Sequence, residues 1–165
     1  MTETPSAGDS PSCNETCSSV TPDGNALCPT SHTIGHKVDL ITVKALLKAS
    51  ALRLLEGKDY LFCPDAKCDV VYFDRTASSV FRKHDLVVRV GRKESEDPIP
   101  VCYCFDFTMA DLRRDIAAGG ETEIPETITV EIRAGRCACE VKNPEGSCCL
   151  GNVWSAIKRI RTGPS

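Results

Sequence analysis

Eleven cysteines, most of them in two dense groups, constrain this 165-residue chain more than any other feature. The N-terminal stretch MTETPSAGDSPSCNETC is acidic and polar, and it has neither the basic start nor the apolar run of a secretion signal. No stretch approaches the roughly 18 apolar residues of a membrane span. We therefore expect a cytoplasmic protein without membrane insertion. In a reducing compartment dense cysteine groups bind metal more often than they form disulfides, and the odd count also argues against complete pairing.

The composition favours two small units over one large core. Hydrophobic residues make up 41% of the chain but aromatic residues only 5%, so each small core needs additional stabilisation, such as a bound metal. With 20 Lys and Arg against 23 Asp and Glu, the chain has no electrostatic footprint for nucleic acid. We expect a disordered tail over 1–25, a first unit over 26–91, a charged and proline-rich linker over 92–100, and a second unit over 101–161. The tail carries Cys13 and Cys17, an untethered pair that makes only a weak metal site.

The first unit is predicted to be rich in β-structure, with one helix. The stretches HKVDLI (36–41), YLFC (60–63) and VVYFD (70–74) have the composition of short strands, and residues 79–91 contain one or two more. Thr42 is predicted to cap a helix that runs to Gly57, because leucines recur at helical spacing between them.

The second unit is predicted to be mostly helical, which makes the whole chain α+β. Thr108 is predicted to cap a helix with Asp111 in its first turn, where an acid suits the helix dipole. Residues 126–135 alternate like a strand but also place isoleucines at helical spacing, and we favour a helix. A cysteine-rich loop over 136–149 then leads to a last short helix over about 150–160.

Cys28, Cys63 and Cys68 form the first predicted metal site. The segment FCPDAKC places two cysteines at the ends of a turn between strands, as in a zinc knuckle, and LCPTSH supplies a third from a distant loop. Structural zinc takes four ligands in a closed tetrahedron, so a fourth ligand is needed. His32 is the first candidate, because it follows Cys28 in the same turn. The alternatives are His36, Asp65 and Asp69.

Zinc at this site is expected to be structural. A catalytic zinc needs an open position and a nearby base, but the chain contains no HExxH motif and no well-placed carboxylate–histidine pair. A cysteine nucleophile would need a histidine partner, and all three histidines lie in the first unit. We therefore expect a metal-binding or electron-transfer protein and not an enzyme.

Six cysteines in the second unit predict an iron–sulfur site. Cys102 and Cys104 form a C-x-C pair, which suits one iron of a [2Fe–2S] cluster because alternate residues of an extended turn can face the same atom. The second iron would take two thiolates from the cysteine-rich loop, which folds back around the turn-forming NPEGS. The four candidates there are Cys137, Cys139, Cys148 and Cys149.

The stretches PVCYCFDFT and GRCACEVKNPEGSCCLGNV resemble the [2Fe–2S] module in the N-terminal region of the CopZ family of copper chaperones, a module related to bacterioferritin-associated ferredoxin. The stretches CPTS, HKVDLITVKALL and YLFCPDAKCDVVYFD resemble the zinc domain that precedes it, so the resemblance covers about residues 26–160. The resemblance implies one zinc ion and one [2Fe–2S] cluster. Its implied cluster ligands are Cys102, Cys104, Cys139 and Cys149, with Cys137 a rival to Cys139 and Cys148 a rival to Cys149.

The resemblance also implies a one-electron redox module in copper handling, which would reduce Cu(II) to Cu(I). Its implied partners are a redox partner protein or copper-transport machinery, and copper is a further metal, for which the spare Cys137 and Cys148 are candidates. The alternative is a zinc-only interaction or regulatory module, which would be colourless.

Two departures from the family pattern affect these expectations. Ser31, in CPTS, stands where the family has a second cysteine, which leaves the fourth zinc ligand open. The copper-carrying domain with its M-x-C-x-x-C loop is missing, since the sequence has only two methionines and no C-x-x-C. A chain of this extent is expected not to carry copper as the full-length chaperone would.

Overall fold

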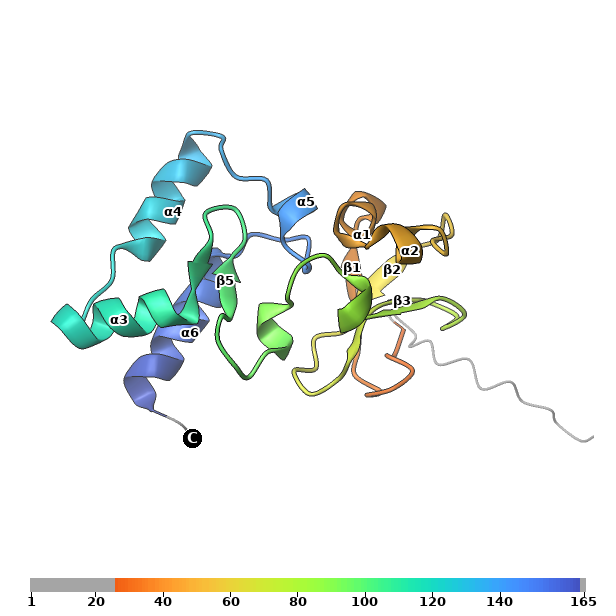
Figure 1. Ribbon diagram of the computed structural model, residues 1–165, viewed down its shortest axis with the longest axis horizontal. Helices are drawn as coiled ribbons and strands as arrows, with labels where there is room; N and C mark the ends of the chain where they lie inside the picture. Colours follow the sequence, from red (N-terminus) through yellow and green to blue (C-terminus); the bar gives the residue numbers. More distant parts are fainter. Residues whose placement is uncertain (1–25, 164–165) are drawn as a thin grey trace, which may run out of the picture.

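The computed structural model describes residues 26–163, so the predicted tail, with Cys13 and Cys17, lies outside the described residues. The described chain mixes helix and sheet, as predicted (Figure 1). A four-stranded sheet with two short helices lies at one end of the molecule, and three longer helices lie around a two-stranded sheet at the other.

The larger sheet is an antiparallel meander. It consists of β1 (His36–Val38), β2 (Tyr60–Phe62), β3 (Val70–Asp74) and β4 (Val80–Arg82), in that spatial order. Every residue of β3 is buried, because this central strand is covered on both faces. A register shift between Val70 and Tyr72 interrupts the strict alternation of side chains, and Val71 and Tyr72 both join the same core.

Two short helices, α1 (Leu40–Leu46) and α2 (Ala49–Leu52), replace the single helix that was predicted up to Gly57. The break follows from tertiary pairing, because Leu47 adopts an extended backbone and forms a bridge with Leu86. The prediction of Thr42 as the helix cap is also wrong. Asp39 precedes the first helical residue, and Thr42 is buried inside α1.

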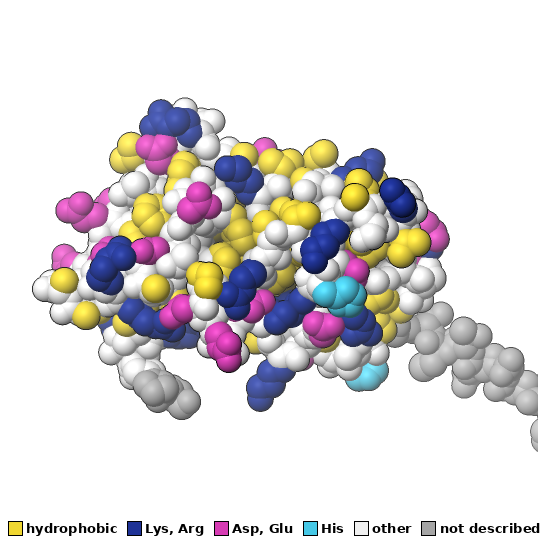
Figure 2. All heavy atoms as spheres, in the orientation of Figure 1, with side chains coloured by type: hydrophobic (Ala, Val, Ile, Leu, Met, Phe, Trp, Pro, Cys, Tyr) yellow, Lys and Arg dark blue, Asp and Glu magenta, His cyan; other side chains and the backbone are white. Residues whose placement is uncertain are grey.

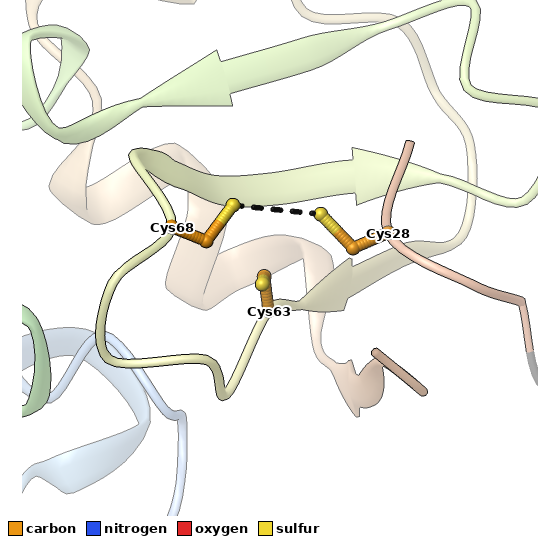
Figure 3. Close-up of side chains that lie close together, drawn as sticks. All are labelled: Cys28, Cys63 and Cys68. Carbon is orange, nitrogen blue, oxygen red and sulfur yellow. Dashed lines mark hydrogen bonds between the residues drawn. The ribbon is translucent and has the colours of Figure 1, made fainter. Parts of the chain in front are cut away.

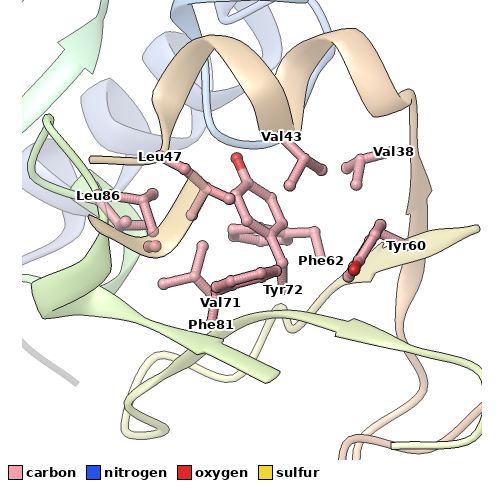
Figure 4. Close-up of a cluster of buried hydrophobic side chains, with 11 residues drawn as sticks. Val38, Val43, Leu47, Tyr60, Phe62, Val71, Tyr72, Phe81 and Leu86 are labelled. Carbon is pink, nitrogen blue, oxygen red and sulfur yellow. The ribbon is translucent and has the colours of Figure 1, made fainter. Parts of the chain in front are cut away.

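Each face of the larger sheet carries its own small core. The first lies between the sheet and the helices α1 and α2 (Figure 4), and its members are Val38, Val43, Leu47, Ala51, Tyr60, Phe62, Val71, Tyr72, Phe81, Leu86 and Val90. The second lies on the opposite face and contains cysteines as well as apolar residues: Ala26, Cys28, Leu61, Cys63, Cys68, Val70 and Phe73. Neither core is large, which fits a fold that gains stability from a metal.

The other end of the molecule is mostly helical. Its elements are β5 (Pro100–Cys102), β6 (Phe107–Thr108), α3 (Met109–Gly119), α4 (Ile124–Arg133), α5 (Cys139–Lys142) and α6 (Leu150–Thr162). The predicted cap of α3 is confirmed, because the Thr108 hydroxyl accepts the Asp111 N–H and the Asp111 carboxylate accepts the Thr108 N–H. The strand alternative for 126–135 is wrong, since α4 covers most of that range, and α5 was not predicted.

The segment over 92–100, predicted as a linker, is held by contacts along its length. A 3-10 turn at Gly91–Lys93 begins it, and Lys93 is only 5% exposed. The Gly91 N–H donates to the Tyr103 hydroxyl at 2.8 Å, and a Cβ at this glycine would lie 1.9 Å from the Pro100 carbonyl oxygen. Only glycine therefore fits at position 91. The division of the chain into two units remains a prediction.

The two ends of the molecule touch through α1 and α5, which lie side by side near its centre (Figure 1). The Thr42 hydroxyl donates to the Glu140 carbonyl at 2.6 Å, and the Tyr72 hydroxyl donates to the Pro144 carbonyl at 2.8 Å. The Arg92 guanidinium also pairs with the Glu145 carboxylate at 2.9 Å.

The surface carries mixed charge. Figure 2 shows Lys and Arg interspersed with Asp and Glu over the visible face, with apolar side chains between them. Within residues 26–163, the helices are too short or too polar to cross a membrane.

Candidate metal centres

Three cysteines meet on one face of the larger sheet. Cys63 follows β2, Cys68 lies just before β3, and Cys28 comes from the loop that precedes β1. All three are buried, and their sulfurs lie within 4.8 Å of one another (Figure 3). The Cys28 and Cys68 sulfurs are 3.8 Å apart. The structure therefore brings together the three predicted zinc cysteines.

The turn over 63–68 is shaped by its own hydrogen bonds and by a distant lysine. The Asp65 carboxylate accepts the Lys67 N–H at 2.9 Å, and the Cys68 N–H donates to the Asp65 carbonyl at 3.3 Å. The buried Lys93 ammonium donates to the carbonyls of Asp65 and Cys68, at 2.7 and 3.1 Å. Lys93 was not predicted as part of this turn, because no local sequence pattern links the two.

The structure does not bring the predicted fourth ligand into this group. The His32 side chain is exposed, and its backbone has a positive φ of 56°. His36 and Asp69 are also exposed. The Ser31 hydroxyl lies here instead, 3.4 Å from the Cys63 sulfur. The only sequence signal for Ser31 was its place three residues after Cys28.

Two of these thiols differ in acidity. Burial by itself would raise the pKa of Cys28, but hydrogen bonds from the Ser31 hydroxyl and from the Ser31 and Thr30 backbone lower it overall. Burial raises the pKa of Cys63 to about 11. Negative charge is therefore better stabilised on the Cys28 sulfur, at the turn that also carries Ser31.

Five cysteines meet at the helical end of the molecule. Cys102 ends β5, Cys104 lies in the turn after it, Cys139 begins α5, and Cys149 directly precedes α6. The Cys102 and Cys149 sulfurs are 3.0 Å apart, and those of Cys104 and Cys139 are 3.6 Å apart. All four predicted cluster ligands pack in one core. Their sulfurs form two close pairs, and the sulfurs that all lie within 4.8 Å of one another are those of Cys104, Cys137 and Cys139.

The fifth member is Cys137, the rival to Cys139. Its sulfur lies 3.2 Å from that of Cys139 and 3.9 Å from that of Cys104. Cys148, the other rival, is exposed and lies outside the group. The NPEGS turn forms as predicted, because the buried Asn143 side chain donates to the Ser147 carbonyl and accepts the Glu145 N–H.

Hydrogen bonds divide the charge unevenly among these thiols. Hydrogen bonding from Cys149 lowers the pKa of Cys139 to about 5 and that of Cys102 to about 7. The pKa of Cys149 is raised, first because its thiol donates to the Cys102 sulfur. Burial raises the pKa of Cys104 to about 12, although its sulfur also accepts the Ala138 N–H at 3.3 Å. Negative charge is therefore favoured on Cys139 and Cys102 and disfavoured on Cys104 and Cys149, and a bound cation would stabilise thiolates at the latter two.

Comparisons with known proteins bear on the first cysteine group and on the fold. Residues 25–87 match the CopZ-type family model described as a zinc binding domain, a range that holds the first cysteine group and ends before the second. The copper chaperone CopZ of Archaeoglobus fulgidus is 40% identical over an aligned stretch of 145 residues, and the match covers 81% of this chain and 67% of that protein. The X-ray structure of the N-terminal domain of Archaeoglobus fulgidus CopZ is similar with a TM-score of 0.66 at 35% identity, over 78% of this chain and 95% of that domain.

Proposed function

Because this chain belongs to the CopZ family of copper chaperones, we propose that it serves copper handling with a structural zinc in its first cysteine group and a [2Fe–2S] cluster in its second. The family relationship supports zinc and a role with copper. The iron–sulfur assignment is the further step, and it depends on the geometry of the second group.

The first cysteine group fits zinc by its chemistry. Three buried thiols with sulfurs within 4.8 Å of one another are soft donors of the kind that structural zinc takes. They lie in the smaller core of the sheet, where sulfur makes up much of the packing. Cys28, Cys63 and Cys68 would hold the ion, and its binding would add to the stability of the sheet.

The observation that carries the iron–sulfur proposal is that Cys102, Cys104, Cys139 and Cys149, from three separate segments of the chain, pack in one core. Four thiolates are what a [2Fe–2S] cluster requires. When bound, such a cluster exchanges one electron at a time, and in copper handling that electron would serve the reduction of Cu(II) to Cu(I), with a redox partner protein as its source. With the cluster bound, the Ala138 N–H would stabilise a thiolate at Cys104 and the helix dipole of α6 would stabilise one at Cys149.

Purification without air, followed by elemental analysis and visible and EPR spectra, tests this proposal. We expect a brown protein with about two irons and one zinc per chain, and an S = 1/2 signal after reduction. The variant Cys102→Ser should lose the colour and keep the zinc. Cys148→Ser is the matched control, because that cysteine is exposed and outside the group, and it should keep both.

The opposite results are equally clear. A colourless wild-type protein with two zinc ions would reject the redox role and support the zinc-only interaction module. Unchanged colour in Cys102→Ser would reject the cluster ligands named here.

A further inference from the structure

We propose that Ser31 supplies the fourth protein ligand of the zinc site, through its hydroxyl oxygen, and that the site is therefore three thiolates and one oxygen. This inference rests on the proposed function, which places zinc at Cys28, Cys63 and Cys68.

The first argument is the position of the hydroxyl. The Ser31 oxygen lies 3.4 Å from the Cys63 sulfur, in the turn that begins with Cys28. In a tetrahedral zinc site with Zn–S of about 2.3 Å and Zn–O of about 2.1 Å, two sulfurs lie ~3.8 Å apart and sulfur lies ~3.6 Å from oxygen. The observed Cys28–Cys68 distance of 3.8 Å and the Ser31–Cys63 distance of 3.4 Å are close to those two lengths.

The second argument is the shape of the loop that carries Ser31. The Cys28 N–H donates to the Thr33 carbonyl and the His32 N–H donates to the Cys28 carbonyl, both at 2.9 Å, which closes a tight turn over 28–33. Within this turn Ser31 is half-buried and faces the sulfurs. His32 takes the left-handed backbone conformation and leaves its imidazole in solvent. The same turn that brings the hydroxyl to the site therefore turns the histidine away.

The third argument concerns the other candidates. The Asp65 carboxylate is used by the Lys67 N–H inside its own turn. Asp69 is exposed and lies 3.7 Å from the Arg82 guanidinium. His36 is exposed on β1. Of the side chains considered within residues 26–163, only that of Ser31 lies against the sulfurs.

The charge balance also favours a neutral fourth ligand. Three thiolates and Zn²⁺ carry one net negative charge, and a fourth anionic ligand would add another. The buried Lys93 ammonium, which hydrogen-bonds the Cys68 carbonyl, supplies one positive charge beside the site. A neutral hydroxyl therefore leaves the buried charges matched. Because oxygen is a harder donor than thiolate, zinc should leave this site faster than a site of four thiolates.

The test measures zinc release from the zinc-loaded protein to a chromogenic chelator. Ser31→Ala should accelerate release on the order of 10-fold, as expected for the loss of a ligand contact. Ser31→Cys should slow it by a similar factor, and in the Co(II)-substituted protein it should raise the sulfur-to-metal charge-transfer absorption. His32→Ala is the matched control from the same turn, and its release rate should stay within about 2-fold of the wild type.

The other possible results would overturn the assignment of Ser31 as the fourth ligand. Accelerated release in His32→Ala with no change in Ser31→Ala would overturn the inference in favour of the histidine. Unchanged release in both, with no spectral change in Ser31→Cys, would overturn it in favour of a solvent ligand. A wild-type protein that binds no zinc would reject the proposed function itself, which is a separate result. Far-UV circular dichroism of each variant checks that the fold is intact.

Discussion

Cys137 and Cys139 are separated by one residue, but the structure gives them different environments. Cys139 is buried, and its pKa is lowered to about 5, first by hydrogen bonding from Cys149. Cys137 is half-exposed, and burial and its neighbours raise its pKa. Because Cys139 is buried within the group and Cys137 is partly exposed, we expect Cys139→Ser to lose most of the visible absorbance and iron, and Cys137→Ser to keep them. Full absorbance in Cys139→Ser and loss in Cys137→Ser would reverse the assignment.

The environment of Asp74 predicts how the free energy of unfolding changes in acid. Burial by itself would raise its pKa, but hydrogen bonds from Ser78, Thr76 and Lys58 lower it to about 2. A folded pKa below the unfolded value means that the carboxylate stabilises the fold above about pH 4, and that this contribution is lost as the pH falls toward 2. Asp74→Asn should therefore lower the free energy of unfolding by about 2 kcal/mol at pH 7.

Urea unfolding of both proteins between pH 7 and pH 2 checks this expectation. The difference between wild type and Asp74→Asn should shrink below about pH 4. Both proteins contain the same cysteines, so loss of metal in acid affects them alike. The exposed Asp59→Asn is the control, and it should change stability little at any pH. A constant difference across the range would contradict the assigned role of Asp74.

At the scale of elements, the turn over 63–68 depends on a side chain from elsewhere in the chain. Lys93 donates to two of its carbonyls and lies 5.6 Å from the centre of the Phe62 ring. Lys93→Met keeps most of the buried volume but leaves both carbonyls without this donor. We expect it to lower the free energy of unfolding by about 2 kcal/mol and to speed zinc release. The exposed Lys44→Met serves as the control, and an equal effect of the two changes would contradict the prediction.

The elements also show which features a sequence can predict. The cap of α3 was predictable because Thr108 and Asp111 satisfy each other within one turn. The end of α1 was not, because Leu47 leaves the helix to pair with Leu86, which lies 39 residues further along the chain and comes close only in three dimensions. Threonine is a common helix cap, but the Thr42 hydroxyl donates to the Glu140 carbonyl instead of capping a helix. Hydrogen bonding within one turn could thus be predicted from the sequence, and pairing between distant segments could not.

The same distinction holds for the metal centres. The cysteine spacing predicted both groups, because short turns bring their ends together whatever surrounds them. Ser31 and Lys93 could not be predicted as parts of the first centre, since their places depend on how one loop turns and how a distant segment packs. The family spacing favoured Cys139 and left Cys137 as a rival, and burial and hydrogen bonding give the two sulfurs different environments in the structure.

At the scale of the whole molecule, contacts between the two ends should make unfolding cooperative. The Tyr72 hydroxyl, on the larger sheet, donates to the Pro144 carbonyl in the cysteine-rich loop, and both residues are buried. Tyr72→Phe leaves that carbonyl unpaired and should lower the free energy of unfolding by about 1–2 kcal/mol. The single tryptophan, Trp154 on α6, reports on the opposite end, and its fluorescence midpoint in urea should fall together with the far-UV circular dichroism midpoint.

Tyr60 provides the matched comparison, because its hydroxyl bonds Ser79 within the sheet end alone. If the described chain unfolds as one unit, Tyr60→Phe should also lower the midpoint seen by Trp154. If the urea midpoint of Trp154 fluorescence is the same in Tyr60→Phe as in the wild type, the two ends unfold separately.

The order of the two cysteine groups along the chain has a consequence for synthesis. Cys68 is the last cysteine of the first group and Cys102 is the first of the second, so the two groups are not interleaved in the sequence. A chain emerging from the ribosome therefore presents a complete first set while Cys149 is still unmade. The partners that join the two ends, Glu140 and Pro144, also emerge late. The sheet end can thus acquire its metal first and then serve as the surface on which the later half docks.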